Sequence, residues 1–357
     1  MYAILYKETV VEVQIAEFRE QDHPRSEDGR FTTKGTSKQQ QADKVRSVFT
    51  KEAKTTELGV PDGAKFRAEI FADKDGEMTI EQIVNHPIVK RAQAQYNRDL
   101  GKIKKSIKVN GVNMEVFENE TVLLDTPERW KLRKQVAEQQ HQKGSVSGKN
   151  ANGQTLYDGA VEHGFRAEIV IGAPAGGKSS VIVDKVSRNT KSRVLDSDEI
   201  KMALPEFNNG RGAGIVHKES ADIILEQMVM KEYGKGGKYA GDNIVIPIVG
   251  KSPKSAEKYL RLLKEAGYQV NLSFNDVSAV NSAKRATTRY IETGRFLSPE
   301  YIASIGNKPQ LTYEELKRRN EFDSYTRYDN NVPFKTPAKR IERVGKDGKP
   351  LNWEDWQ

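Results

Sequence analysis

A short glycine-rich segment of the chain has residue types that suit the binding of phosphate groups. The sequence "GAPAGGKSS" matches G-x-x-x-x-G-K-[ST] and lies between an apolar run and a helical pattern. Glycine-rich backbone lets N–H groups close around the β- and γ-phosphates of a nucleotide, next to the positive end of the helix. We expect Lys178 to neutralise these phosphates and the Ser179 hydroxyl to ligate Mg²⁺. The predicted nucleotide-binding loop comprises Gly172, Ala173, Pro174, Ala175, Gly176, Gly177, Lys178, Ser179 and Ser180.

Two carboxylates follow the loop at a distance that suits the next strand of a parallel sheet. In "VLDSDEIK", Asp196 and Asp198 lie eighteen and twenty residues after Lys178, which is the length of a crossover helix and a return strand. Either carboxylate could accept a proton from an attacking hydroxyl or help to hold Mg²⁺. Capping of the following helix is the alternative role. We assign Asp198 to catalysis, and Asp196 to substrate binding and, with Ser179, to the metal.

Three arginines further along the chain could approach the transferring phosphate from a lid. Arg285 and Arg289 are four residues apart, hence on one face of a predicted helix, and Arg295 lies in the following turn. Phosphoryl transfer spreads negative charge over the transferring group, which arginine side chains stabilise. A solvated basic helix face gives the same pattern, so the sequence does not single out one of the three.

One expected acid of motor ATPases and GTPases is absent. Those proteins carry a strand that ends in an acidic residue, and the candidate strand here, "NIVIPIVG", has Pro247 and Ile248 where such a residue would lie. The two acids of "VLDSDEIK" take the position that small kinases use instead. The phosphate loop therefore suits a donor site that faces a hydroxyl acceptor.

Strand and helix signals alternate from Phe165 onward, which indicates a parallel sheet with right-handed crossover helices. The helix of "SPKSAEKYLRLLKEAG" is well delimited, with Ser252 as N-cap, Pro253 at its first position and Gly267 at its end. The predicted fold class is α/β, a P-loop NTPase-type mostly parallel sheet with flanking helices. A small α+β N-terminal module precedes it.

The expected organisation has five parts, with boundaries drawn from composition and apolar periodicity. The small module has two predicted helices around Pro87 and a hairpin that turns at Asn110-Gly111. A helix with Thr126 as N-cap and Pro127 at its first position opens the next part. The five parts are an N-terminal element (1–18), a polar linker (19–58), the α+β module (59–120), the P-loop domain (125–332) and a basic C-terminal tail (333–357).

Composition narrows the class of protein without choosing its partner. The chain has 357 residues, a net charge of +8 and no cysteine, so disulfides and thiolate metal sites are excluded and a cytoplasmic location is expected. The basic balance permits an anionic partner such as a nucleotide or nucleic acid, although basic and acidic residues are interspersed. No run of eighteen apolar residues is present, so we expect no membrane span.

Taken together and in order, several segments resemble the zeta toxin family of P-loop kinases. They are the loop, "VLDSDEIK", "VHKESADIILEQM", "LLKEAGYQV" and "RATTRYIETGRFLSPEYI", with "TPERWKLRKQV" ahead of the loop and "YDNN" after it. The resemblance implies ATP- or GTP-dependent phosphorylation of a hydroxyl, in the best-known members on UDP-N-acetylglucosamine, and an antitoxin partner. Lys178 and Ser179 match the nucleotide loop and Asp198 the proposed general base.

The resemblance also carries further roles and one departure. Arg285, Arg289 or Arg295 match the phosphate-binding arginines, while Ser220 and Glu226 lie in the helix that lines the substrate side. The third strand of the sugar-nucleotide kinases is followed by acidic and small polar residues, whereas this chain has "IPIVGKS". The acceptor therefore stays open, as UDP-N-acetylglucosamine or another nucleotide-containing metabolite.

Two other readings remain open at this point. The basic charge is compatible with a polynucleotide or nucleotide kinase. The N-terminal 120 residues, with the phage-like style of "DHPRSEDGRFTTKG", are compatible with a structural or delivery protein of a phage or mobile element. That reading would add a virion-associated location, delivery into a target cell or an immunity protein as partner.

Overall fold

The computed structural model describes most of the chain from residue 78 onward. The described residues are 4–6, 9–11, 78–109, 114–117, 120–123, 126–151, 153–210, 212–293, 296–332 and 336–352. The expected polar linker and Arg295 lie outside these residues, as does "KFRAEIFA" (65–72), whose apolar pattern predicts a strand. None of the described helices combines the length and the apolar character needed to cross a bilayer.

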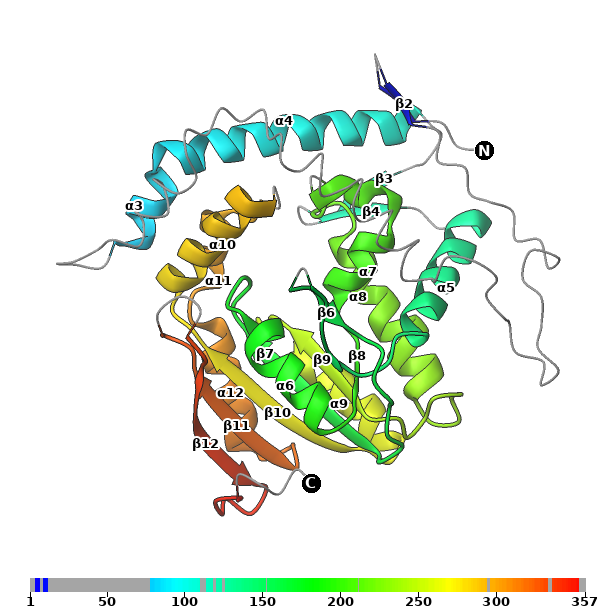
Figure 1. Cartoon of the computed structure of the whole chain (residues 1–357), viewed down its shortest axis with the longest axis vertical. Coiled ribbons are helices and arrows are strands. Elements are labelled where there is room, and N and C mark those ends of the chain that lie inside the picture. The colour runs from blue at the N-terminus through cyan, green and yellow to red at the C-terminus, as the bar shows by residue number, and fades with distance from the viewer. Residues whose placement is uncertain are drawn as a thin grey trace.

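A six-stranded sheet forms the centre of the protein (Figure 1). Five strands are parallel and one edge strand, β12, is antiparallel to its neighbour, in the order β12-β11-β10-β7-β9-β8. The run "RAEIVIG" forms the central strand β7, which is buried from its second residue onward. The strands are β7 (Arg166–Gly172), β8 (Arg193–Val194), β9 (Ile244–Ile248), β10 (Gln269–Asp276), β11 (Ser324–Asp329) and β12 (Lys339–Gly345).

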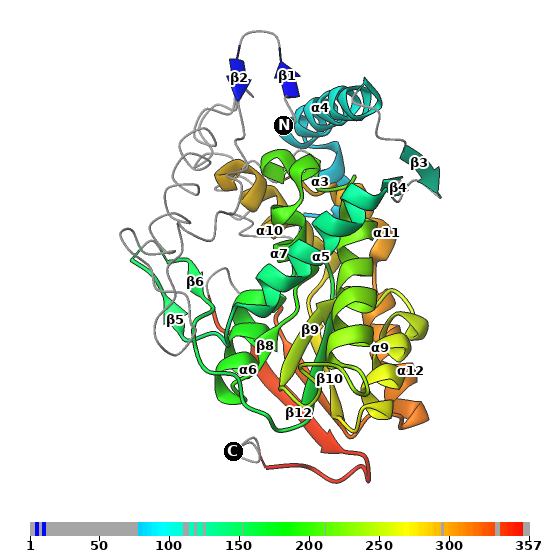
Figure 2. The same ribbon diagram turned by 90° about the vertical axis from the view of Figure 1, so that its right-hand side faces the viewer.

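Helices cover both faces of this sheet (Figure 2). The larger core lies on the face to which β7 turns Ile169 and Ile171, where these pack with side chains of α5, η4, α9 and α12. The other face packs Val170 against η2 and α6. The helices of this part are α5 (Pro127–His141), η2 (Ser179–Val183), α6 (Asp184–Asn189), α7 (Ser197–Ala203), η3 (Pro205–Gly210), α8 (His217–Asp222), η4 (Ile223–Tyr233), α9 (Pro253–Glu265), α10 (Ala279–Thr293), α11 (Pro299–Ile305) and α12 (Lys308–Arg319).

The predicted sheet and helix starts are confirmed where the local signals are strong. Helix α5 begins at Pro127, and the Thr126 side chain accepts a hydrogen bond from the Arg129 N–H. Helix α9 begins at Pro253, although the Ser252 side chain makes no capping hydrogen bond. Proline at the first helical position loses no hydrogen bond and has a helical φ, so it fixes these starts.

Helix α5 is joined to the rest of the domain by a buried ion-pair network. The Arg129 guanidinium donates to Glu219 of α8 and to Glu206 of η3, at 2.8 Å from each carboxylate. Arg133 adds a second cation at Glu219. Each buried charge is therefore paired, as the low-dielectric interior requires, and α5 is fixed against α8.

The described residues ahead of this domain form two helices and two hairpins. Helices α3 (Ile80–Asn85) and α4 (Pro87–Val109) meet at His86, as the break at Pro87 predicts. The hairpins are β1 (Ile4–Tyr6) with β2 (Thr9–Val11), and β3 (Met114–Phe117) with β4 (Glu120–Leu123). A third short pair, β5 (Gly148–Lys149) with β6 (Thr155–Leu156), follows α5.

One sequence expectation was wrong. The hairpin does not turn at Asn110-Gly111, because α4 continues to Val109 and the hairpin begins only at Met114. The structure also adds a strand to the expected tail: β12 pairs with β11 and extends the sheet to Gly345.

A carboxylate lies inside the sheet on the face that carries Val170. Glu168 of β7 is 2% exposed, and its carboxylate accepts a hydrogen bond from the Ser273 hydroxyl of β10. Burial raises the pKa of Glu168 to about 7, against the lowering effects of Ser273 and the Arg343 charge. A raised pKa means that ionised Glu168 disfavours the folded state.

We therefore expect Glu168→Gln to stabilise the protein at alkaline pH. The stability that protonated Glu168 contributes to the folded state is fully present below its ordinary pKa of 4.5. It is lost as the pH rises through about 7. The variant should exceed the parent by up to about 3 kcal/mol in free energy of unfolding at pH 8, and by far less at pH 5. Urea unfolding at both pH values measures this difference, and an equal difference at both would contradict the argument.

Candidate functional site

The phosphate loop lies at the carboxyl end of the central strand, between β7 and η2. Gly177 has φ +82° and the neighbouring Ala175 has φ +59°, so the loop turns through left-handed backbone twice. A Cβ on Gly176 would lie 2.7 Å from Val277 Cγ1 and 2.9 Å from the Ala173 carbonyl oxygen. Only glycine fits at Gly176, and the sequence therefore dictates a tight loop here.

Three side chains converge on the carbonyl oxygen of Gly176. Asn330 Nδ2 donates to it at 2.7 Å, Arg285 Nη1 at 2.9 Å and Asn275 Nδ2 at 3.0 Å. Asn330 Nδ2 also donates to Asn275 Oδ1 at 3.0 Å. We call Asn275, Asn330 and Arg285 the loop clamp. It joins the ends of β10 and β11 and the helix α10 to the phosphate loop.

Lys178 is held by the loop that contains it. Its Nζ donates to the carbonyl oxygens of Gly172 and Ala173, each at 2.9 Å. Burial lowers the pKa of Lys178 to about 8, while the charges of Asp198 and Asp196 act in the opposite direction. The ammonium group is therefore already fixed at the loop, and orienting it toward an anion requires little further loss of conformational freedom.

The two acids lie at the same edge of the sheet, directly after β8. Asp196 is the N-cap of α7 and its Oδ1 accepts a hydrogen bond from the Asp198 N–H at 2.9 Å. Asp198 Oδ1 accepts from Lys201 Nζ at 2.9 Å. Burial and then the Asp198 charge raise the pKa of Asp196 well above its usual range. The capping role left open by the sequence is thus present at Asp196, and both acids lie close enough to influence Lys178.

The two described arginines of α10 have different environments. Besides Gly176, Arg285 donates from Nη2 to the carbonyl oxygens of Asn330 at 2.9 Å and Val332 at 3.3 Å. Its charge is largely buried, which lowers its pKa. Arg289 lies one turn further along α10, and its positive charge contributes to the lowered pKa of Lys178. Arg285 therefore contacts the loop backbone, whereas Arg289 lies near the phosphate-binding lysine.

Two expected substrate residues have contacts away from the loop. Ser220 is buried in α8 and its hydroxyl donates to the His217 carbonyl of the same helix at 2.8 Å. Glu226 is exposed on η4 and acts electrostatically on Lys258 of α9. These contacts tie the two side chains to their own helix and to α9 rather than to the phosphate loop. Their assignment to substrate binding stays a prediction.

Oxygen donors suitable for a hard cation lie beside the loop. Ser179 and Ser180 lie at the start of η2, and Ser180 Oγ donates to the Gly177 carbonyl at 3.3 Å. Among the described residues, no group of three or more His, Cys, Asp or Glu side chains gathers at one place. A hydroxyl and a carboxylate, with phosphate oxygens from a nucleotide, are what Mg²⁺ takes. Ser179 and Asp196 are therefore of the donor types that the predicted ion takes, and their assignment to it stays a prediction.

Two members of the clamp were not predicted from the sequence. Asn275 ends the apolar strand "QVNLSFND", and Asn330 belongs to "YDNN", which was noted only as a family feature. Their signal is a polar residue at the carboxyl end of a buried strand, where ligands of α/β sheets bind. Ser282 of α10, whose hydroxyl donates to the Pro174 carbonyl, gave no signal of this kind.

Comparisons with known proteins assign the domain that carries this site. A family model for zeta toxins matches residues 166–336, just under half of the chain. A structure of the PezAT chromosomal toxin-antitoxin system of Streptococcus pneumoniae is 13% identical, with a TM-score of 0.41, and the match covers 65% of this chain and 87% of that one.

Two other similar structures contain AvrRxo1-ORF1 with AvrRxo1-ORF2. The one with sulphate ions is 16% identical, with a TM-score of 0.40, and the match covers 63% of this chain and 70% of that one. The one with ATP is 14% identical, with a TM-score of 0.38, covering 62% and 69%. The comparison with curated proteins found no match. By the family model, which spans the phosphate loop, both acids and the arginine-bearing helix, residues 166–336 are a zeta-toxin-family domain with a P-loop kinase-type fold.

Proposed function

We propose that the protein is a kinase that transfers the γ-phosphoryl group of ATP or GTP to a hydroxyl group of a small molecule. The observation that carries the proposal is the placement of Lys178, Asp196 and Asp198 at one edge of the sheet, around a glycine loop that admits phosphates. The zeta toxin family match over residues 166–336 supports the same reaction class.

The donor side follows from the contacts of the loop. Lys178 uses two of its three N–H donors on Gly172 and Ala173, and the third can reach a phosphate oxygen. Backbone N–H groups of the loop and the start of η2 supply the remaining donors. Ser179 and Asp196 would hold Mg²⁺, which neutralises charge on the β- and γ-phosphates when bound.

On the acceptor side we assign the proton transfer to Asp198. Its carboxylate would take the proton of the acceptor hydroxyl as that oxygen attacks the γ-phosphorus. The bond between the γ-phosphorus and the β–γ bridging oxygen breaks, and the nucleoside diphosphate leaves. Asp198 Oδ1 accepts a hydrogen bond from Lys201 Nζ at 2.9 Å, which would orient the carboxylate for the role of general base.

The two described arginines then have separate roles. Arg285 is a positioning residue, because its donors are engaged with backbone carbonyls of the loop and of residues 330–332. Arg289 is the better candidate for contact with the transferring phosphate, since its charge reaches Lys178. Arg295 stays a third candidate.

We propose a nucleotide-containing metabolite, such as UDP-N-acetylglucosamine, as acceptor, toxicity as the outcome and an antitoxin as partner. The family match supports these assignments, while "IPIVGKS" leaves the acceptor's identity open. The net charge of +8 favours one second candidate, a polynucleotide or nucleotide kinase.

Expression in bacteria tests the proposed reaction. The parent should slow growth and produce a phosphorylated nucleotide sugar or related metabolite, which mass spectrometry of extracts detects. Lys178→Ala and Asp198→Asn should abolish both effects, whereas Lys185→Ala, an exposed lysine on the adjacent α6, should behave as the parent. Growth inhibition that persists in Lys178→Ala would refute the kinase as its cause.

The roles of the two arginines separate in kinetics. Arg285→Ala should weaken ATP binding about tenfold or more, because the loop loses one member of its clamp. Arg289→Ala should leave ATP binding within about threefold and lower kcat about 10²-fold or more. Isothermal titration and steady-state assays give these values. The assignment fails if Arg285→Ala lowers only kcat.

The lowered pKa of Lys178 predicts a pH dependence for nucleotide binding. Lys178 loses its charge as the pH rises through about 8, and binding of an anion then requires uptake of a proton. The affinity for ATP should fall by up to about tenfold per pH unit above pH 8. Lys178→Arg should show a flat profile between pH 7.5 and 9.5, since its guanidinium stays charged. A flat profile in the parent would contradict the lowered pKa.

A further inference from the structure

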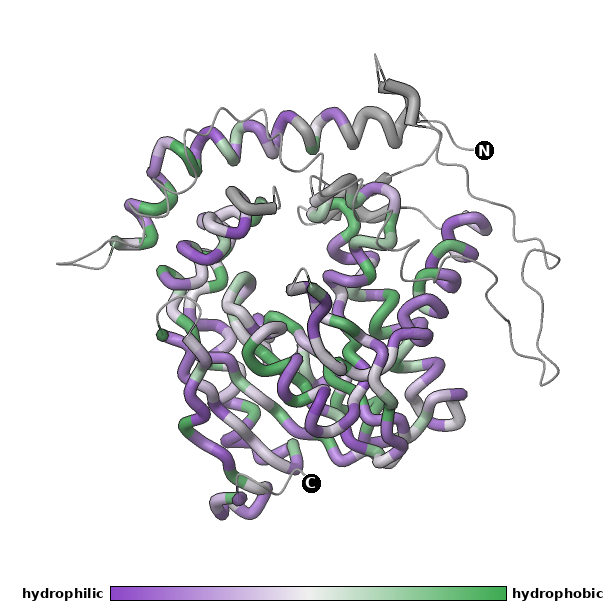
Figure 3. Tube along the Cα trace, in the orientation of Figure 1, coloured by the Kyte–Doolittle hydropathy of each residue, from purple (hydrophilic) through white to green (hydrophobic). Residues whose placement is uncertain are grey.

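Helices α3 and α4 lie outside the zeta toxin domain and cross above it (Figures 1 and 2). We call residues 80–109 the strap. The strap runs over the carboxyl edge of the sheet, which is the edge where ligands of such sheets bind. Figure 3 shows that α4 is largely hydrophilic, with its apolar residues mainly toward its first turns.

The first end of the strap packs on the arginine-bearing helix. Ile83, Ile88 and Val89 form one apolar cluster with Ala283 and Ala286 of α10 and Ile302 of α11. Ala175 of the phosphate loop packs against the same cluster. One apolar cluster therefore includes residues of the strap and of the helix that carries Arg285 and Arg289, and Ala175 of the loop packs against this cluster.

The middle of the strap reaches the opposite side of the site. Ala92 and Tyr96 pack with Tyr290 and Phe296, and the Tyr96 hydroxyl hydrogen-bonds with the backbone of Gly214 in the turn before α8. A Cβ on Gly214 would lie 2.8 Å from this hydroxyl oxygen, which shows how close the two elements are. Strand β4, which follows the strap in the chain, also lies against α8. The strap thus spans from α10 and α11 to the α8 side.

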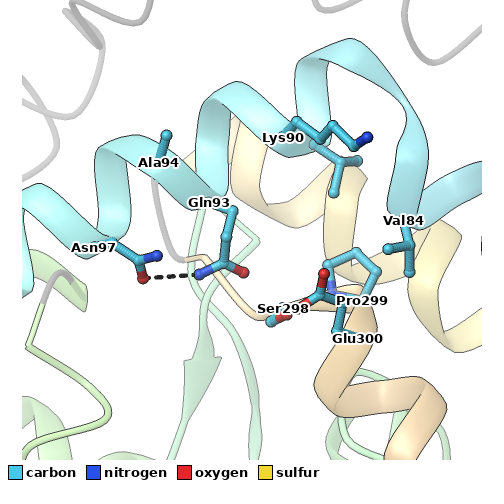
Figure 4. A pocket seen from close by; sticks show the side chains of 9 residues that line it. Val84, Lys90, Gln93, Ala94, Asn97, Ser298, Pro299 and Glu300 are labelled. Carbon is cyan, nitrogen blue, oxygen red and sulfur yellow. Dashed lines mark hydrogen bonds between the residues drawn. The ribbon is translucent and has the colours of Figure 1, made fainter.

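The docking surface of the strap is narrow and incompletely packed. Its contacts repeat at about every fourth residue, through Ile88, Ala92, Tyr96 and Leu100. A cavity of about 200 Å³ separates α4 from the start of α11 (Figure 4). Its lining includes Gln93 and Asn97, hydrogen-bonded to each other at 2.9 Å, and Ser298. A surface whose contacts run along one stripe of α4, beside a cavity, opens more readily than the core of the domain.

We propose that the strap docks reversibly and that its docked state limits entry of the nucleotide to the phosphate loop. The inference rests on the proposed nucleotide-binding function. The strap reaches from α10 and α11 to the turn before α8, and Ala175 of the phosphate loop packs against the same apolar cluster as its first end. Undocking would break the Tyr96–Gly214 contact first, because only one side chain makes it.

The chain has no cysteine, so a single introduced thiol reports opening without background. Ala92→Cys places this thiol on the docked face of the strap, at a site that is 2% exposed, and Ala137→Cys places a matched thiol at a site that is 4% exposed on α5. With N-ethylmaleimide, the Ala92→Cys variant should react at least tenfold faster than the Ala137→Cys variant. Adding Tyr96→Ala should accelerate labelling at position 92 at least fivefold further and leave labelling at position 137 unchanged.

Stopped-flow binding of the fluorescent nucleotide N-methylanthraniloyl-ATP with Mg²⁺ tests the limit on entry in the full chain. The association rate should rise at least fivefold in Tyr96→Ala and less in Tyr96→Phe, which keeps the ring contact with Phe296. Equal association rates in parent and Tyr96→Ala overturn the proposal even if the thiol at position 92 reacts rapidly.

The labelling experiment can overturn the proposal independently. It does so if the Ala92→Cys variant reacts no faster than the Ala137→Cys variant, because the strap then opens no more readily than the core. If neither the parent nor Tyr96→Ala binds the nucleotide, the proposed function fails, and the proposed limit on nucleotide entry fails with it. Binding by Tyr96→Ala alone supports both.

Discussion

The site depends on the hydrogen bonds that hold the carbonyl of Gly176. A phosphate loop must turn its N–H groups inward, so its carbonyl groups need other partners. Here the loop clamp supplies three donors to one carbonyl, from the ends of two strands and from α10. The same contacts place α10 relative to the loop. They therefore place Arg289 relative to Lys178, and they hold in position the helix whose Ala283 and Ala286 pack against the strap.

Burial at this edge of the sheet shifts the pKa of both Lys178 and Asp196 toward the neutral form of each group. A site that disfavours the charged forms of its own side chains is stabilised when ligands supply charge of the opposite sign. In the proposed function, an anionic nucleotide would restore the charged form of Lys178, and a divalent cation would do the same for Asp196. This complementarity of charge would give a physical reason for nucleotide and Mg²⁺ to bind together. Asp198 differs from Asp196 in its partner, because its Oδ1 accepts a hydrogen bond from Lys201 Nζ.

Local chemistry explains which parts of the fold could be predicted from the sequence. The glycine loop, the buried run of β7 and the proline at the start of α5 and α9 are signals within a few residues. The capping role of Asp196 was also among the stated alternatives, because it depends only on Asp198 two residues later. The clamp could not be predicted in this way. Asn275 and Asn330 are 55 residues apart, and they meet only because β10 and β11 pair in one register. The strand β12 escaped detection because it is a polar edge strand that is buried only at Arg343 and Gly345.

Transfer of label from [γ-³²P]ATP into a small-molecule extract of bacterial cells tests the central claim most directly. Thin-layer separation after incubation with the purified full chain should show a labelled product distinct from inorganic phosphate and ATP. The product should disappear with Lys178→Ala and with Asp198→Asn. Label released only as inorganic phosphate, or label found only on added oligonucleotide ends, would contradict a small-molecule kinase.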